Sequence, residues 1–277
     1  MEPHELSRIR IATVVALASL AGLALILSAA PATGGLAALR PDLVTLRVQQ
    51  HDLVITRTKD ETVLRLTNEV GNRGNGPLEV FPSEASPNCD GDGDPANDRE
   101  ASQRLFADSN ASGLFERGAD GVASEQAVGC MRYHAAHDHW HVLDFARYQL
   151  RRERTGKLAS ASRKVGFCLV DNRRAFTGPG SAMTAFYPFG SDDPKVGCDA
   201  GATQGLTPGW ADIYAFALPG QQLAIDGLPR GRYCLISKAD PLGLLTELDE
   251  ANNERRTRIA LRPQAASVRR LDGPCRI

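Results

Sequence analysis

The segment Thr62-Val63-Leu64-Arg65-Leu66-Thr67 places Leu64 and Leu66 in alternation with Arg65 and Thr67. Successive side chains of a β-strand point to opposite faces of a sheet, so this alternation predicts a strand with one buried face. Runs of similar character, separated by glycine and proline, lie at residues 43–48, 53–57, 62–70, 78–81, 140–150, 165–170, 213–218, 233–237 and 257–261. The pattern predicts an all-β fold with a β-sandwich core.

Two stretches of different composition interrupt these runs. Residues 83–129 and 172–208 are rich in Asp, Asn, Gly, Ser and Pro. We expect both to form long irregular loops, and such loops often carry functional sites. Because the chain shows no repeat of fixed period, one domain over residues 40–277 is the simplest partition.

The overall composition excludes some partners. The 277 residues are 42% hydrophobic, which is enough for one large domain with a well-filled core. Thirty-two basic and 33 acidic side chains give a net charge of -1. No overall field draws such a chain to nucleic acid, and we expect no nucleic-acid partner.

The N-terminus has the layout of an export signal. Arg8 and Arg10 precede an uncharged apolar run at residues 11–30, which small residues and Pro31 follow. We expect residues 1–32 to be a cleaved signal peptide, or else an N-terminal membrane anchor through residues 11–30, because the run is long enough to span. Either outcome exports the protein, which is then secreted or anchored on the outer face of the cell membrane.

Six cysteines follow this segment, and none forms a CxxC pair. In an oxidising compartment their expected use is in disulfides rather than as free buried thiols. Sequence alone does not choose among the possible pairings. We favour the sequential one, Cys89 with Cys130, Cys168 with Cys198 and Cys234 with Cys275.

Four of the six histidines lie within eight residues, at positions 134, 137, 139 and 141. On a strand, His137, His139 and His141 share one face and can bind a single ion. Imidazole suits zinc, copper, iron and nickel, and three histidines leave positions open for water or substrate. The alternative is a solvated, pH-sensitive strand. We expect His134 outside the ligand set, as an acid, a base or a support for a ligand.

The histidine segment, followed by Asp144 and Phe145, resembles the copper-binding segment of lysyl oxidases, and we expect a bacterial member of that family. Further matching segments follow the family's order along nearly the whole exported chain. They are Pro41-Asp42-Leu43-Val44, residues 64–76, Lys164-x-x-x-Cys168-Leu169-x-Asp171, Gln204-Gly205-Leu206-x-Pro208-Gly209-x-x-Asp212-x-Tyr214, Gly231-x-Tyr233, Glu247-x-Asp249-x-x-Asn252-Asn253 and Cys275.

The resemblance implies a catalytic pair at Lys164 and Tyr214. In the family, a lysine and a tyrosine crosslink to form lysine tyrosylquinone, and copper on the three alternating histidines drives that step. The implied reaction is oxidative deamination of a primary amine, either peptidyl lysine or a small amine, by molecular oxygen. Aldehyde, ammonia and hydrogen peroxide are released. Without the resemblance, Lys164 and Tyr214 read as a strand-end charge and a core aromatic residue.

Two residues are candidates for the base that removes the substrate proton. Asp212 lies two residues from Tyr214 and so on the same strand face, and His134 belongs to the histidine segment. The plainer interpretation of either residue is a hydrogen-bonding support.

The same resemblance implies a calcium site that joins the start of the domain to its end. Its ligands are the side chains of Asp42, Glu247, Asp249, Asn252 and Asn253 and the backbone carbonyl of Leu43, all of them oxygen donors, as calcium prefers. The run Asp90-Gly-Asp92-Gly-Asp94 lacks the glycine and glutamate of an EF-hand, and we expect a polar turn.

The chain departs from the animal enzymes at residues 131–133, which are Met, Arg and Tyr where those enzymes have tryptophans. It also has an added aromatic-rich piece at residues 176–189, which is able to line or cover the entrance. Two other functions stay open. One is a secreted copper-binding module without amine oxidase activity. The other is a zinc hydrolase, although the chain has no HExxH motif.

Overall fold

The computed structural model describes residues 37–83, 88–135, 138–162, 165–190, 195–198 and 203–277. The chain separates into Met1–Gly35 and Leu36–Ile277, and only the second unit contains described residues. The expected signal peptide or anchor therefore lies outside the described residues, as do His137 and Lys164. In the part that is described, no helix is long and apolar enough to cross a membrane.

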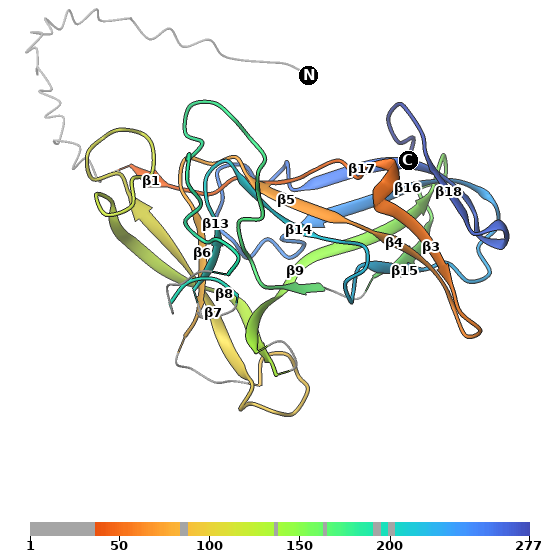
Figure 1. Cartoon of the computed structure of the whole chain (residues 1–277), viewed down its shortest axis with the longest axis horizontal. Helices are drawn as coiled ribbons and strands as arrows, with labels where there is room; N and C mark the ends of the chain where they lie inside the picture. Colours follow the sequence, from red (N-terminus) through yellow and green to blue (C-terminus); the bar gives the residue numbers. More distant parts are fainter. Residues whose placement is uncertain (1–36, 84–87, 136–137, 163–164, 191–194, 199–202) are drawn as a thin grey trace, which may run out of the picture. The chain divides into compact units, whose positions relative to one another are not determined.

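Three antiparallel sheets make up the described fold (Figure 1). The largest contains, in spatial order, β13 (Gln204–Leu206), β6 (Leu78–Pro82), β7 (Asp98–Ala107), β8 (Gly121–His134), β9 (His139–Arg152), β16 (Gly231–Ala239), β17 (Glu254–Arg262) and β18 (Ser267–Arg270). Short strands β1 (Ala38–Leu39), β10 (Leu158–Ala161) and β11 (Val165–Phe167) pair with β7 or β9.

Two smaller sheets complete the fold. One contains β12 (Arg173–Arg174), β14 (Trp210–Tyr214), β5 (Asn68–Asn72) and β2 (Leu43–Thr45), and the other contains β15 (Gln222–Ala224), β4 (Thr62–Leu66) and β3 (Leu53–Arg57). Two 3-10 turns, η1 (Gln50–Asp52) and η2 (Pro263–Ala265), are the only helical elements among the described residues.

The small sheets pack on the large one. Strand β2 contacts β16 and β17, while β15 contacts β9. One hydrophobic core lies between them and draws buried side chains from all three sheets, including Leu43, Leu64, Tyr148 and Leu235. This layered arrangement confirms the expected all-β fold with sheets packed face to face.

Most of the expected strands are present. Strand β3 has the bounds predicted from sequence, and the run at residues 62–70 becomes β4 and β5 with a short break between them. The expectation of one long loop over residues 83–129 was wrong, because that stretch contains β7 and most of β8. In β8, residues 121–125 are all exposed, so no apolar alternation marks this strand in the sequence.

The three disulfides are those expected. Cys89–Cys130, Cys168–Cys198 and Cys234–Cys275 have Cα atoms 5.7, 5.8 and 5.6 Å apart, the usual separation for a bridged pair. No free cysteine remains, which removes the free-thiol alternative.

We predict that Gly205→Ala destabilises the fold. A Cβ at position 205 would overlap the carbonyl oxygen of Leu78 and lie 2.9 Å from the Tyr187 ring. Overpacking of this kind costs about 1–3 kcal/mol. Gly121→Ala is the control, since a Cβ there has nothing within 4 Å. Denaturant unfolding measures both variants, and equal midpoints for the two would contradict this account of Gly205.

Candidate functional site

The site is built on the hairpin formed by β8 and β9. In its register His134 lies opposite His139, and Arg132 lies opposite His141. Directly opposed residues of an antiparallel pair point to the same face of the sheet. The hairpin therefore gathers three histidines and one arginine on one face.

The rings of His139 and His141 converge. Their Nε2 atoms are 3.0 Å apart, and the His134 ring stacks on the His141 ring with centroids 5.2 Å apart. Strand β9 begins at His139, so the alternating pair lies on the strand as expected, while His137 lies outside the described residues.

A bulge in β9 lies next to the histidines. Strand β11 pairs Val165 with Ala146 but Phe167 with Val142, so several residues of β9 face a single residue of β11. Within this bulge Asp144 has a φ of 58°. Bulges of this kind bend a strand and change the direction of its side chains. Opposite the bulge, a Cβ on Gly166 would lie 2.9 Å from Leu143, so glycine allows the strands to approach.

Tyr214, at the end of β14, is tied to the residue that follows β11. Its hydroxyl accepts a hydrogen bond from the Cys168 N–H (2.6 Å) and donates one to the Cys168 carbonyl (2.8 Å). The Phe167 ring lies against it, with centroids 3.7 Å apart. Burial raises the pKa of Tyr214 well above its usual value, and the nearby Asp212 adds to this.

Asp212 lies two residues earlier on the same strand and is 3% exposed. Its Oδ2 is buried and has no hydrogen-bond partner among the described residues. Burial raises the pKa of this carboxyl well above its usual value, although two backbone N–H groups act in the opposite direction. The carboxyl thus holds a proton more firmly than an exposed aspartate does.

These side chains line one cavity of about 400 Å³, which we call the histidine cavity. Its polar lining comprises Arg132, His134, His139, His141, Asn172, Asp212 and Tyr214. Its other lining residues are Gly166, Cys168, Val170, Phe189, Cys198, Ile213, Leu218, Pro219 and Gly220. The structure therefore brings together all the described residues that were predicted for the amine chemistry.

Sequence reasoning missed part of this lining. Asn172 and the turn at residues 218–220 carry no motif, and their place in the cavity depends on pairing between distant strands. Phe189, by contrast, belongs to the aromatic-rich piece at residues 176–189, which the sequence suggested was able to line or cover the entrance. It lines the cavity and is 65% exposed. The signal for Phe189 was the aromatic composition of this loop, since loops often carry functional residues.

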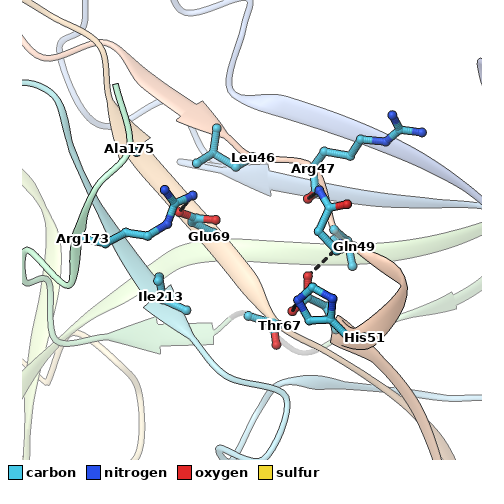
Figure 2. A pocket seen from close by; sticks show the side chains of 11 residues that line it. Leu46, Arg47, Gln49, His51, Thr67, Glu69, Arg173, Ala175 and Ile213 are labelled. Atoms are coloured by element: carbon cyan, nitrogen blue, oxygen red, sulfur yellow. Dashed lines mark hydrogen bonds and ion pairs between the residues drawn. The ribbon is translucent and has the colours of Figure 1, made fainter. Parts of the chain in front are cut away.

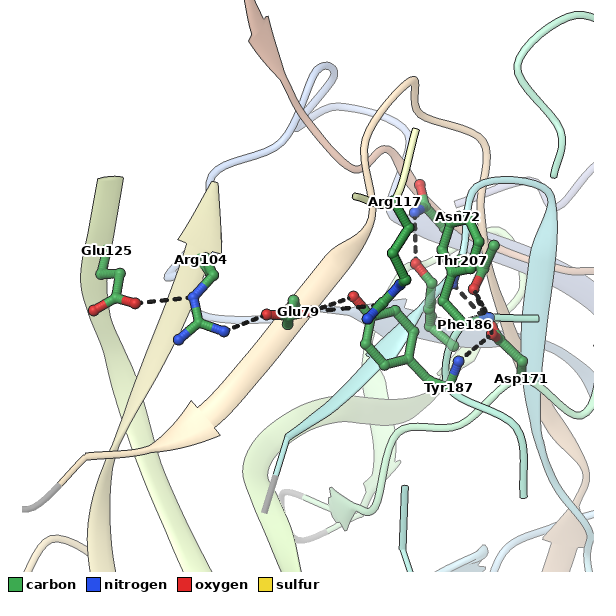
Figure 3. A network of polar contacts seen from close by, with 10 residues as sticks. Asn72, Glu79, Arg104, Arg117, Glu125, Asp171, Phe186, Tyr187 and Thr207 are labelled. Atoms are coloured by element: carbon green, nitrogen blue, oxygen red, sulfur yellow. Dashed lines mark hydrogen bonds and ion pairs between the residues drawn. The ribbon is translucent and has the colours of Figure 1, made fainter. Parts of the chain in front are cut away.

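A buried polar network holds this added piece in place (Figure 3). The Asp171 carboxylate accepts hydrogen bonds from the N–H groups of Phe186 (3.2 Å) and Tyr187 (3.0 Å) and from the Thr207 hydroxyl (2.5 Å). The Tyr187 hydroxyl donates to Glu79, which also pairs with Arg104. The backbone two residues before Phe189 is therefore fixed to the large sheet.

A second pocket has a volume of about 450 Å³ (Figure 2). It shares the lining residue Ile213 with the histidine cavity. Both of its carboxylates already have partners. Glu69 forms an ion pair with Arg173, and Asp52 accepts a hydrogen bond from the Gln49 N–H at 2.7 Å. Burial raises the pKa of Glu69 although Arg173 opposes the shift. These contacts account for Glu69, Arg173 and Asp52 as parts of the internal structure.

The residues expected to bind calcium also come together. The Glu247 carboxylate accepts hydrogen bonds from the Leu43 N–H (2.5 Å) and from Asn253 Nδ2 (2.7 Å). Asn252 Nδ2 donates to Asp42 (2.7 Å) and to Asp249 (3.1 Å). Burial raises the pKa of Glu247 to about 8.

The expected polar turn at residues 90–94 is present, and its aspartates bond within the loop. Asp90 Oδ1 accepts from the Asp92 N–H at 2.9 Å, and Asp92 Oδ1 accepts from the Asp94 N–H at 2.7 Å. The loop also pairs with Arg132 of the histidine cavity.

Fold and cavity together define a class of protein, a disulfide-bonded β domain with clustered histidines beside a partly buried tyrosine. Comparison with known proteins narrows the class. The profile of the Lysyl oxidase family matches residues 112–270, which is more than half of the chain. The chain belongs to the lysyl oxidase family.

Individual relatives agree with this assignment. The chain is 30% identical over 128 residues to Lysyl oxidase homolog 1 of Homo sapiens, which covers 46% of this chain and 20% of that protein. It is equally similar to Protein-lysine 6-oxidase of Rattus norvegicus, with 28% of that protein covered, and of Sus scrofa, with 45% covered. The matched segment spans less than half the length of each of these relatives.

Proposed function

We propose that this protein is a copper-dependent amine oxidase of the lysyl oxidase type, with Lys164 and Tyr214 forming a lysine tyrosylquinone. It would convert primary amines, either peptidyl lysine or small amines, to aldehydes with release of ammonia and hydrogen peroxide. The observation that carries the proposal is that Tyr214, His139 and His141 line the same cavity. Relatives named Protein-lysine 6-oxidase support it.

The described histidines fit a bound copper ion. Two imidazole nitrogens that each lie about 2.0 Å from one ion are about 3 Å apart, and the Nε2 atoms of His139 and His141 are 3.0 Å apart. Imidazole is a preferred ligand of copper. We assign His137, His139 and His141 as the ligands and His134, stacked on His141, as their support.

The surroundings of Tyr214 fit a precursor of an organic cofactor. Hydrogen bonds to the Cys168 backbone fix the phenol in the cavity wall. Lys164 directly precedes β11 in the chain, and β11 carries the Phe167 ring that lies against Tyr214. When formed, the quinone supplies an electrophilic carbonyl and an electron sink, which oxygen restores.

Asp212 is our candidate for the base that removes the substrate proton. Its raised pKa makes it a better proton acceptor than an exposed carboxylate, provided that it is ionised when substrate binds. It lies on the same strand as Tyr214 and lines the same cavity. His134 is the alternative base, since it also lines the cavity.

The competing function is a secreted copper-binding module that lacks the quinone. It shares the histidines with the enzyme, so copper binding does not separate the two. The presence of both Lys164 and Tyr214 favours the enzyme. A zinc hydrolase is less consistent, because the chain has no HExxH motif.

We also propose a calcium ion between Asp42, the Leu43 carbonyl, Glu247, Asp249, Asn252 and Asn253. The Oδ1 atoms of Asn252 and Asn253 are buried and have no hydrogen-bond partner among the described residues. Buried oxygens without partners are costly unless a cation or water satisfies them. A calcium ion would join the start of the catalytic domain, residues 40–277, to the loop before β17.

Export through residues 1–32 is part of the proposal, whether the apolar run is cleaved or stays as an anchor. Three disulfides in the described fold support an oxidising compartment.

We predict a covalent Lys164–Tyr214 peptide in copper-loaded protein. Proteolytic digestion followed by mass spectrometry detects it as a crosslinked pair. Protein purified without copper is the control and should give both peptides uncoupled. Active enzyme with both residues unmodified would rule out the quinone.

Tyr214→Phe is expected to keep copper but abolish peroxide release from amines, because no quinone can form without the phenol oxygen. Copper content by metal analysis and peroxide release by a coupled assay give the two measurements. Tyr133→Phe is the matched control on the neighbouring hairpin and should retain activity. Undiminished turnover by Tyr214→Phe would contradict the assignment.

Calcium is expected to raise the midpoint of thermal unfolding of wild-type protein but not of Glu247→Gln. A ligand present at about 100 times its Kd stabilises the folded state by about 2.7 kcal/mol. Glu254→Gln, which removes a carboxylate paired with Arg256, is the control and should respond like wild type. An equal response of Glu247→Gln and wild type would exclude the site.

A further inference from the structure

The guanidinium of Arg132 is the fixed positive charge of the histidine cavity among the described lining residues. The sheet places it in a row between two neighbours, because Arg132 lies opposite Asp98 on β7 and opposite His141 on β9. Arg132 therefore lies directly beside the histidines on the face where the proposed chemistry takes place.

An acidic loop holds this guanidinium from one side. Arg132 Nη1 donates to Asp90 Oδ2 at 2.6 Å and lies 3.7 Å from Asp92 Oδ2. The Asp90 side chain is 5% exposed. The disulfide between Cys89 and Cys130 fastens this loop to β8, two residues before Arg132. The charge is thus anchored by a buried partner and a covalent link.

The acidic loop contacts only one nitrogen of the guanidinium, Nη1. The side-chain hydrogen bond and ion pairs of Arg132 with described residues all involve Nη1, and the side chain is 39% exposed. This leaves Nε and Nη2 as donors for a ligand in the cavity. Two parallel N–H donors on a planar group match the two oxygens of a carboxylate, which makes arginine a specific carboxylate receptor.

Other lining groups are compatible with an anionic ligand that carries an alkyl chain. Asp212 supplies the carboxyl group among the described lining residues. Burial raises its pKa, so it competes only weakly with a substrate carboxylate for the guanidinium of Arg132. Val170, Leu218 and Phe189 give the cavity apolar surface for methylene groups.

We propose that Arg132 determines substrate specificity by binding a carboxylate on the amine substrate, so that the cavity prefers primary amines that carry a carboxylate at the far end of an alkyl chain. The inference rests on the proposed amine oxidase function for its reaction. It adds a substrate class to that reaction.

The kinetic test compares 6-aminohexanoate with hexylamine, which differ by the carboxylate. Wild type is expected to have the higher kcat/KM for 6-aminohexanoate. Arg132→Gln is expected to lower the ratio of the two kcat/KM values by about tenfold or more, mainly through KM, because a charge-assisted, two-point contact is lost. Arg255→Gln removes an exposed arginine on β17 and should keep the wild-type ratio.

Arg132→Lys keeps the charge but loses the planar fork, and we expect a smaller fall in the ratio. This variant also covers the case in which Arg132→Gln does not fold. A wild-type ratio in Arg132→Gln overturns the proposal, and so does a wild-type ratio in Arg132→Lys.

A binding test separates this inference from the proposed reaction. Hexanoate and hexanamide are titrated into the metal-free full chain, followed by NMR, so that coordination of the carboxylate to copper plays no part. We expect hexanoate to bind more tightly than hexanamide in wild type and in Arg255→Gln, and equally weakly in Arg132→Gln. If wild type binds hexanoate more tightly than hexanamide but does not oxidise amines, only the proposed amine oxidase reaction is refuted. Equal affinity of wild type for hexanoate and hexanamide refutes the role of Arg132.

Discussion

The two hydrogen bonds between the Tyr214 hydroxyl and the backbone of Cys168 connect the parts of the site. Tyr214 ends β14 of a small sheet, whereas Cys168 follows β11 of the large sheet and is bonded to Cys198. A single phenol therefore joins two sheets and a disulfide-closed loop. Because its hydroxyl both donates and accepts, the phenol is fixed in position, and its ring stays in the wall of the histidine cavity.

Strand β9 carries the histidines of the site and holds them in position. It pairs with β8, β16, β10 and β11, so it cannot move without disturbing the large sheet. The bulge around Asp144 and the absence of a side chain at Gly166 let β11 approach the strand just after His141. The histidines and Tyr214 thus line one cavity beside a break in the regular ladder. The site depends on that irregularity as much as on the regular pairing.

The sequence predicted what depends on local periodicity. Alternation identified β3 and β4, and spacing by two residues placed His139 with His141 and Asp212 with Tyr214, since side chains two apart share a strand face. It failed at β8, whose first residues are exposed and show no apolar alternation. The meeting of β14 with β11 joins residues 46 apart in the chain, and no local pattern encodes such a contact. Only the family resemblance selected Tyr214. It marked Arg132 as part of a departure from the animal enzymes and assigned it no role.

The positive charge of Arg132 in the cavity accounts for the position of the acidic loop around Asp90. A guanidinium beside three imidazoles, and near any cation that they bind, is unfavourable unless an anion lies close to it. Asp90 supplies that anion from outside the cavity, and the Cys89–Cys130 disulfide keeps it there. Asp212 also lines the cavity and is buried with a raised pKa, so its ionised form is available at a cost that a nearby cation would reduce. In the proposed reaction, the carboxyl that accepts the proton, Asp212, is therefore separate from Asp90, the anion that neutralises Arg132. This separation would allow recognition and proton transfer to share one cavity.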